Sequence, residues 1–544
     1  MSAALPEEGD PAPLAAPPPA RPASPPLAGM TEVSRRRTVG NALANYGRAA
    51  VTMLLGLFLQ SYLVRSLGAA EYSLWPIVGT CIAAVALIPR GIGAGVGRFL
   101  THALGEGRTD EVTAITSSLF FALLAAAGVS LLAVLGLSLG FERLFDVPTG
   151  TAGIGPWAML LAGLGGVVGI PFAVFQGGLV ATQRLVLLNS VTTGIYVLRV
   201  VLTVLLFSLL GPSLVLLAAV SLADAFVTAG LLTWLGRRAL PWQRISLAAA
   251  NRQTLRRVVG FSAWLFLSSV SVLLYWQTDN VIINKLLDPT LVAGYSIVAT
   301  LGLSAASLTT LGCTALAPAL TILHAQGDLA RIERAVQRTN RAVVPLGAWP
   351  LLLGAFYGEE LLVLYVGEAF RSFGGLFPIV AGAFLISATQ QAPGQVPIAF
   401  GKMKLASLGG FTAASTTVLL SVLSVLFAVG LDWGLPGVAA GTLVTWIVYK
   451  GIFWNWLVAR LLQVDGLTYA WRSTVRPLLS CLPLALVYLA GRLLGLGATL
   501  PQLVGITLAA GLAEGLFLVG YGLAPEDRQA VLALLRRWRR GRRA

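Results

Sequence analysis

Residues 119–139 read LFFALLAAAGVSLLAVLGLSL, a stretch without a single charged side chain. At 1.5 Å of rise per residue, a helix of this length crosses the ~30 Å hydrocarbon core of a bilayer. The whole chain of 544 residues shares this character, because 56% of its residues are hydrophobic and only 11% are charged. A soluble protein carries about 25% charged residues. The sequence therefore predicts a protein whose solvent is lipid.

Similar apolar runs recur along the chain, and most of them exceed the ~20 residues that a spanning helix needs. In lipid only helices and closed barrels satisfy the backbone, and a barrel strand needs only about 10 residues. We therefore expect an all-α fold, a polytopic membrane bundle of about 14 transmembrane helices. The predicted spans are residues 40–66, 72–99, 111–139, 155–181, 185–210, 213–236, 258–287, 291–323, 330–357, 373–400, 405–430, 435–459, 473–495 and 500–522.

Polar segments lie at both ends of the chain and at its middle. Residues 1–33 are rich in proline and alanine, which predicts a disordered tail without the apolar core of a signal peptide. Residues 237–257 form a basic connection, and residues 525–544 form a basic tail expected to contact anionic membrane lipid. Arginine and lysine gather on one side of the predicted spans, so both termini are expected in the cytoplasm. The net charge of +15 then indicates membrane topology and not nucleic-acid binding.

The basic connection separates two groups of six predicted spans that resemble each other. Residues 38–78 and 258–298 each contain a long helix, a short hairpin and then a Tyr-Ser pair. Many transporters build two lobes around a central path from such repeats; the alternative is that apolar helices merely share composition. The repeats predict an N-lobe at residues 34–236, a C-lobe at 258–462 and an extra pair of spans at 463–524.

Two stretches in the first lobe, LVRSLGAAEYSLWPIV (residues 63–78) and IPRGIGAGVGRFLTHALGEGRTDEV (residues 88–112), resemble a known family. They are similar to the N-terminal signature of bacterial polysaccharide and O-antigen flippases, in the multidrug/oligosaccharidyl-lipid/polysaccharide exporter superfamily. Ser73 stands where that family usually has glycine. The resemblance implies two lobes that form a V around a central cavity. It also implies that a lipid-linked sugar crosses the inner membrane by alternating access. Fourteen spans are similar to the lipid II flippase branch.

Few ionisable side chains lie within the predicted spans, and each is costly if it faces lipid. Arginine binds phosphate through a bidentate fork, so Arg48 and Arg90 are the candidate contacts for a lipid pyrophosphate. Snorkelling or an ion pair is the alternative for Arg48. The resemblance places Glu71 near the family's gating acidic position. Arg199 and Asp224 lie on neighbouring spans and are expected to pair with each other.

Polar residues also mark the second lobe. Asp279 lies in the sequence YWQTDN and is a candidate for binding a coupling cation or proton, with Gln277 beside it as a cavity contact. Helix–helix hydrogen bonding with Lys285 as partner is the alternative for Asp279. The sequence QQAPGQVPIAF supplies Gln391 as a candidate sugar contact, and kinks that serve only helix packing are the alternative for this segment. Prolines lack a donor and bend helices, so Pro89, Pro393 and Pro397 are expected to bend theirs.

These residues favour a flippase for a lipid-linked oligosaccharide over two alternatives. A cation-coupled multidrug exporter of the same superfamily would favour carboxylates over arginines in the first lobe. A membrane glycosyltransferase or polymerase would need acidic residues and a sizeable external loop. We therefore expect no enzyme, no cofactor and no metal. The expected partners are a lipid-linked saccharide, membrane lipids and a polysaccharide polymerase or glycosyltransferases, with no nucleic acid. The expected location is the bacterial inner membrane.

Overall fold

The computed structural model describes residues 35–93, 96–258, 277–313, 316–401, 416 and 418–522. Throughout these residues the regular structure is helical, and none of them lies in a strand, so the predicted all-α fold is confirmed. The predicted tails at 1–33 and 525–544 lie outside the described residues. So do large parts of the predicted spans at 258–287 and 405–430.

The N-lobe, as we use the term for the structure, consists of the helices before the basic connection. They are α1 (Arg35–Val85), α2 (Leu87–Gly93), α3 (Val96–Gly105), α4 (Thr109–Leu139), α5 (Phe141–Leu144), α6 (Ile154–Val168), α7 (Ala173–Ala181), α8 (Leu185–Leu210) and α9 (Leu214–Ala239).

The C-lobe follows the basic connection and begins, within the described residues, with the helical segment 277–286. Its further helices are α11 (Leu291–Cys313), α12 (Leu316–Ala325), α13 (Leu329–Val366), η1 (Glu368–Leu376), α14 (Phe377–Thr389), α15 (Gln395–Ala399), η2 (Leu426–Gly430), α17 (Gly434–Trp446), η3 (Ile447–Trp454) and α18 (Asn455–Leu462). A last group packs on α13 and consists of α19 (Gly466–Ala470), η4 (Trp471–Val475), α20 (Arg476–Leu479), α21 (Leu482–Leu493), α22 (Leu500–Phe517) and η5 (Leu518–Gly522).

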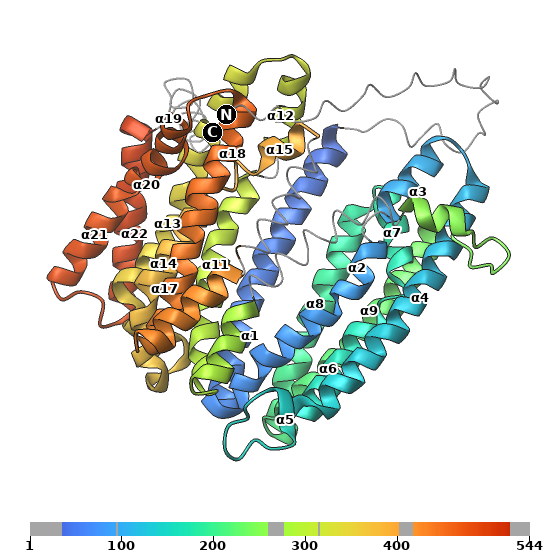
Figure 1. Cartoon of the computed structure of the whole chain (residues 1–544), viewed down its shortest axis with the longest axis horizontal. Helices are drawn as coiled ribbons and strands as arrows, with labels where there is room; N and C mark the ends of the chain where they lie inside the picture. Colours follow the sequence, from blue (N-terminus) through green and yellow to red (C-terminus); the bar gives the residue numbers. More distant parts are fainter. Residues whose placement is uncertain are drawn as a thin grey trace, which may run out of the picture.

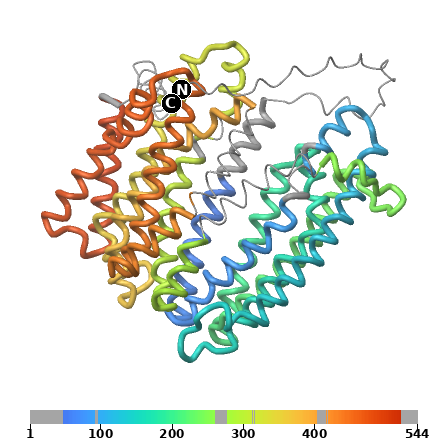
Figure 2. The backbone as a smooth tube through the Cα atoms, viewed as in Figure 1, coloured from blue at the N-terminus to red at the C-terminus, as the bar shows by residue number. Residues whose placement is uncertain are grey.

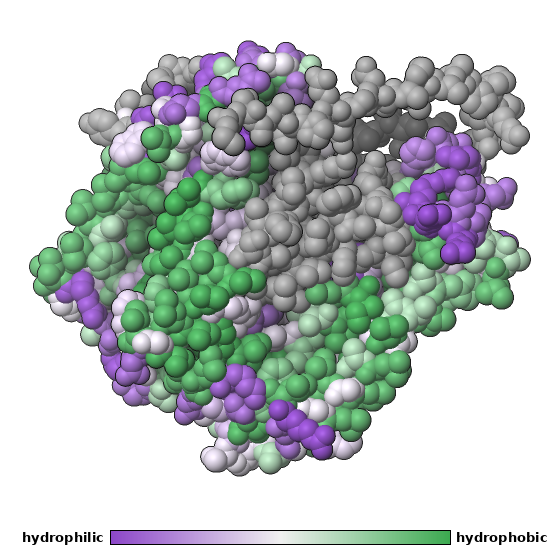
Figure 3. Space-filling view, in the orientation of Figure 1, coloured by the Kyte–Doolittle hydropathy of each residue, from purple (hydrophilic) through white to green (hydrophobic). Residues whose placement is uncertain are grey.

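Within the described residues, ten helices are long and apolar enough to cross a membrane, and α6 with α7 makes an eleventh if the bent pair is one span. One of the ten, at Gly47–Arg90, overlaps both of the predicted spans 40–66 and 72–99. The count of fourteen stays a prediction, since two predicted spans lie partly outside the described residues. Figure 3 shows a broad apolar belt over the helices, with hydrophilic residues toward both ends. Leu132, Leu139 and Leu209, at 70%, 86% and 70% exposed, belong to this lipid-facing surface.

The two lobes stand side by side in a V, which Figures 1 and 2 show opening upward from the end where α5 lies. At that closed end α1 reverses its direction at Gly68, whose φ of 77° is left-handed and favours glycine. The first half of α1 contacts α11 and α13 of the C-lobe, and the second half runs back into the N-lobe. α1 therefore belongs to both sides of the V.

Two prolines, Pro89 and Pro393, coincide with places where helices end, whereas others such as Pro76 lie inside a helix. A proline cannot donate to the carbonyl four residues before it. α1 ends at Val85, four residues before Pro89, and α14 ends at Thr389, four residues before Pro393. The freed carbonyl of Thr389 accepts a hydrogen bond of 2.6 Å from the buried Asn340 Nδ2. The breaks at these positions thus have a local chemical cause.

Candidate functional site

A cavity of about 740 Å³ lies between the two lobes. It is lined from the N-lobe by residues of α1, α2, α8 and α9. From the C-lobe it is lined by the segment 277–286, α11, α14 and α17. A volume of this size is within the range of small-molecule sites, about 300–1,000 Å³. Six aromatic side chains of the described residues line it, which suits the apolar faces of sugar rings; they are Tyr72, Trp75, Tyr196, Tyr295, Phe384 and Trp446.

The N-lobe wall of the cavity carries two arginines. Arg90 lies in the last turn of α2 with an exposed side chain, and no carboxylate lies within 4 Å of it among the described residues. Arg199 of α8 donates from Nη2 to Ser221 Oγ at 2.9 Å. No salt bridge within 4 Å joins Arg199 to Asp224, but the two charges interact electrostatically over a longer distance, so the expected pairing is present only in this weaker form. The direct hydrogen-bond partner of the guanidinium is therefore a hydroxyl, and the Asp224 carboxylate offsets its charge only from a longer distance.

The other predicted residues of the first lobe lie outside the cavity lining. Arg48 has an exposed side chain in the first half of α1 and is not among the residues that line the cavity. The structure therefore does not bring Arg48 and Arg90 together on this cavity wall. Glu71 Oε1 accepts a hydrogen bond of 2.6 Å from the backbone N–H of Leu214, the first residue of α9. A carboxylate at a helix N-terminus satisfies an otherwise unpaired donor.

Among the described residues, the C-lobe wall of the cavity carries one buried carboxylate, that of Asp279. Its Oδ2 accepts hydrogen bonds from the hydroxyls of Tyr295 on α11 and Thr442 on α17, the latter at 2.8 Å. Its Oδ1 has no hydrogen-bond partner among the described residues. Lys285, the alternative partner, donates instead to Asp146 Oδ1 at 3.0 Å. Asp279 therefore ties three helices of one lobe together and keeps one oxygen available.

The lobes are hydrogen-bonded to each other at the closed end of the V. The Tyr365 hydroxyl of α13 lies 2.6 Å from Leu57 O and 3.1 Å from Gln60 Oε1 on α1. Its backbone carbonyl accepts from Ser61 Oγ and from Arg65 Nε, the latter at 3.1 Å. These contacts close that end of the cavity.

Two further contacts cross between the lobes. Thr80 Oγ1 of α1 donates to Gln277 Oε1 at 2.7 Å, and Gln277 lines the cavity. Asn284 exchanges two hydrogen bonds with the backbone of Asp146, at 3.0 and 2.9 Å. Gln277 is thus already engaged, through its amide oxygen, in holding the lobes together.

The remaining predicted residues of the second lobe lie apart from the cavity. Gln391 is half-buried in the turn after α14, and its carbonyl faces Gln395 Nε2 at 3.4 Å. Pro393 and Pro397 are buried, Pro393 in that turn and Pro397 within α15. None of the three is among the residues that line the cavity.

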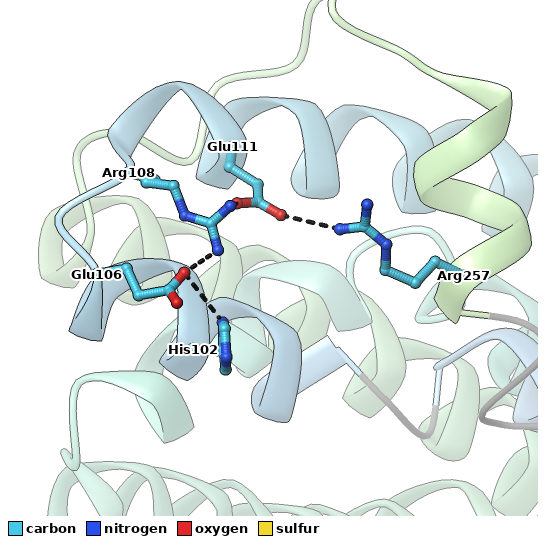
Figure 4. A network of polar contacts seen from close by, with 5 residues as sticks. All are labelled: His102, Glu106, Arg108, Glu111 and Arg257. Carbon is cyan, nitrogen blue, oxygen red and sulfur yellow. Dashed lines mark hydrogen bonds and ion pairs between the residues drawn. The ribbon is translucent and has the colours of Figure 1, made fainter. Parts of the chain in front are cut away.

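A polar network lies at the open end of the N-lobe, away from the cavity (Figure 4). Glu111 of α4 pairs with Arg108 at 2.6 Å and with Arg257 at 3.3 Å. Glu106 pairs with Arg108 and lies 3.3 Å from His102 Nδ1. The network joins the turn between α3 and α4 to the basic connection, which anchors that connection to the N-lobe.

Residues 40–324, more than half of the chain, match the family described as "Polysaccharide biosynthesis protein". The chain belongs to this family. It is 22% identical over 426 residues to "Uncharacterized membrane protein EpsK" of Bacillus subtilis (strain 168), a match that covers 77% of this chain and 83% of that protein.

Two solved structures have the same fold. "Lipid II flippase MurJ, inward closed conformation" matches with a TM-score of 0.64 and 11% identity, over 88% of this chain and 98% of that one. An inward-facing MATE multidrug resistance transporter of the MOP superfamily matches with a TM-score of 0.62 and 13% identity, over 78% and 99%. The predicted relationship to this superfamily is confirmed. The chain is a multi-pass membrane protein with the fold of its transporters.

Sequence reasoning missed several cavity residues. The sequence predicts only an ion pair for Arg199, which lines the cavity, because a sequence cannot show which neighbour a guanidinium meets. Tyr72 and Tyr295 also line the cavity, and the repeated Tyr-Ser pair was the signal that could have found them. Equivalent positions of two lobes around one path face that path together.

Proposed function

We propose that this protein is a flippase that moves a lipid-linked oligosaccharide, a precursor of a surface polysaccharide, across the bacterial inner membrane. The observation that carries the proposal is the cavity between the lobes with Arg90 and Arg199 on one wall. A lipid-linked saccharide combines a phosphate group with sugars. Arginine forks bind the phosphate, and the aromatic and amide side chains of the cavity suit the sugars.

The N-lobe wall acts as the phosphate site in this mechanism. Arg90 has no carboxylate partner among the described residues, so its charge is available to an anionic head group. Arg199 is oriented by Ser221 and adds a second positive charge on the same wall. Arg48, in the first half of α1, meets the head group on its way into the cavity.

The C-lobe wall acts as the coupling site. Asp279 takes up a proton or a small cation at Oδ1, which has no other partner among the described residues. Binding at Oδ1 changes the charge of the carboxylate that accepts hydrogen bonds from Tyr295 and Thr442. This change alters the packing of α11 against α17. Glu71 gates the closed end through its bond to α9, and the bends near Pro89, Pro393 and Pro397 let helices flex as the V closes at one end and opens at the other.

A cation-coupled multidrug exporter is the second candidate, and Asp279 is the observation that favours it. A buried carboxylate in a cavity attracts organic cations as well as protons. The two arginines on the opposite wall weigh against a cationic cargo, because like charges repel it from the N-lobe side. We place both termini and the basic connection in the cytoplasm, where a polysaccharide polymerase or glycosyltransferases supply or consume the cargo.

The test is an extract of lipid-linked saccharides from cells depleted of this protein, compared with undepleted cells. A flippase predicts accumulation of a complete, unpolymerised lipid-linked unit together with loss of the surface polymer, and the mass of that unit identifies the cargo. An unchanged lipid pool with higher sensitivity to cationic drugs would instead establish the exporter.

A further inference from the structure

A second cavity opens on the outer side of the N-lobe, away from the space between the lobes. It has a volume of about 430 Å³ and lies where α6 and α7 bend by 44° relative to each other beside α9. Its lining includes Phe172, Phe226 and Trp234, which are 36%, 59% and 55% exposed. These rings belong to membrane-spanning segments, so their exposed faces meet lipid. We call this cavity the outer groove.

The length of the outer groove matches one leaflet of a bilayer. Phe226, Gly230, Trp234 and Arg237 line it from successive turns of one face of α9. From Phe226 to Arg237 the helix rises roughly 16 Å, and half of the ~30 Å hydrocarbon core is about 15 Å. The groove therefore runs from the middle of the bilayer to the surface at which the basic connection begins.

The surface end of the outer groove carries oriented positive charge. Arg237 Cζ lies 4.9 Å from the centre of the Phe175 ring, and Arg238 Cζ lies 5.5 Å from the Trp234 ring. Neither arginine has a carboxylate within 4 Å among the described residues. Stacking holds both guanidinium groups near the groove while their charge stays unneutralised. Their natural counter-charge at this depth is a lipid phosphate.

We propose that the outer groove binds one anionic phospholipid of the leaflet on the side of the basic connection. The acyl chain lies along Phe172 and Phe226, and the phosphate meets Arg237. This lipid fills the space left by the bend between α6 and α7. It is a second lipid site, separate from the cargo path, and its existence does not depend on what the central cavity carries.

The test uses the purified full-length protein in phosphatidylcholine nanodiscs that contain phosphatidylglycerol with the same acyl chains. Native mass spectrometry then counts the phosphatidylglycerol that each protein molecule retains. A Cβ at Gly230 meets no heavy atom within 4 Å, so Gly230→Leu starts its side chain in open space and directs it into the groove that Gly230 lines. Gly128→Leu on α4 is the matched control, because Gly128 is also helical, exposed and without a neighbour within 4 Å.

The proposal predicts that Gly230→Leu lowers retained phosphatidylglycerol to the level of phosphatidylcholine, while Gly128→Leu behaves as the unaltered protein. Arg237→Gln should reduce the preference for phosphatidylglycerol about fivefold, the effect of one basic charge at a membrane surface. Retention by Gly230→Leu equal to that of the unaltered protein would overturn the site. Displacement of phosphatidylglycerol by an equimolar prenyl phosphate would also overturn it, since the groove would then belong to the cargo.

Discussion

The two lobes place a tyrosine from their repeated Tyr-Ser pairs in the same cavity but give it different partners. In the N-lobe, Tyr72 accepts a hydrogen bond of 3.2 Å from the amide of Gln60. In the C-lobe, Tyr295 donates to the carboxylate of Asp279. One pair is neutral, and the other contains a group that can change its charge.

The difference shows how two lobes with similar sequence patterns can carry different chemical groups and so take on different functions. The neutral pair stands on the wall that carries Arg90 and Arg199, and the charged pair stands on the opposite wall. The cavity is thus positive on one side and negative on the other. An anionic cargo and a coupling cation can occupy such a cavity with each facing its own counter-charge.

The largest effect on export is expected when a positive charge is removed from the N-lobe wall of the cavity. Arg90→Ala should lower export roughly ten- to a hundredfold, because a charge-assisted contact to phosphate contributes about 1.5–3 kcal/mol. The measurement is the lipid-linked saccharide pool in cells that carry the variant, normalised to the amount of membrane-inserted protein.

A matched control separates this effect from loss of any arginine. Arg371→Ala removes a guanidinium that pairs with Glu368 at the closed end of the V, outside the cavity. Normal export by Arg90→Ala, or an equal defect in Arg371→Ala, would contradict a phosphate site on the N-lobe wall.

Substitution of the side chains that hydrogen-bond the two tyrosines tests the comparison between the lobes. Asp279→Asn makes the C-lobe pair neutral like its counterpart and should remove the part of transport that a proton or sodium gradient drives, about tenfold. Vesicles with the purified protein, assayed with and without each gradient, provide the measurement. Gln60→Glu adds a carboxylate to the N-lobe pair and should not restore coupling to Asp279→Asn, because Gln60 contacts Tyr72 and Tyr365 and not the hydroxyls that Asp279 binds. Gradient dependence that survives Asp279→Asn would refute the coupling role.

A smaller effect is expected where the lobes touch. Tyr365→Phe removes the hydroxyl beside Leu57 O and Gln60 Oε1 but keeps the backbone contacts of Tyr365. Loss of a hydrogen bond of about 1 kcal/mol should raise the population open at this end about fivefold. Distances between spin labels at Arg143 and Glu368, both exposed at this end, report the change. An unaltered distance distribution would mean that this bond does not hold the lobes closed.

The smallest effect concerns a turn outside the membrane. Two hydrogen bonds from Thr290, at 2.7 and 2.8 Å, lower the pKa of Asp288 from 3.8. A lowered pKa means that the ionised form stabilises the fold above pH 3.8, and that this stability is lost as the pH falls through the lowered value. Since Asp288 is exposed, Asp288→Asn should cost only about 0.5 kcal/mol at pH 7. Melting curves of both proteins should converge in acid; a constant difference would exclude the charge as its cause.

The fold was predictable because lipid imposes few solutions on a chain. Long uncharged runs such as 119–139 define spans by length alone, and Pro89 and Pro393 mark helix ends through a missing donor. The bend of α1 at Gly68 was visible only as a short hairpin, since sequence does not say how sharply a chain reverses.

The sequence predicted the types of residue that line the cavity better than it predicted which individual residues line it. Arg90, Gln277 and Asp279 all line the cavity, because a polar group inside a span must face the protein interior or water. Arg48 and Gln391 do not line it, and Arg199 does. Those outcomes depend on how each helix is rotated about its axis, which neighbouring helices decide and hydropathy does not record.

The reversal at Gly68 also sets the mechanical scale of the molecule. The second half of α1, from Gly68 to Val85, is roughly 25 Å long at 1.5 Å per residue. A rotation of this helix by about 10° about Gly68 would therefore displace its far end by ~4 Å, which is somewhat less than the pitch of an α-helix. Gly68 lies at one membrane surface. A small change in the backbone dihedral angles of this one glycine therefore produces a larger change in the distance between the lobes at the other surface.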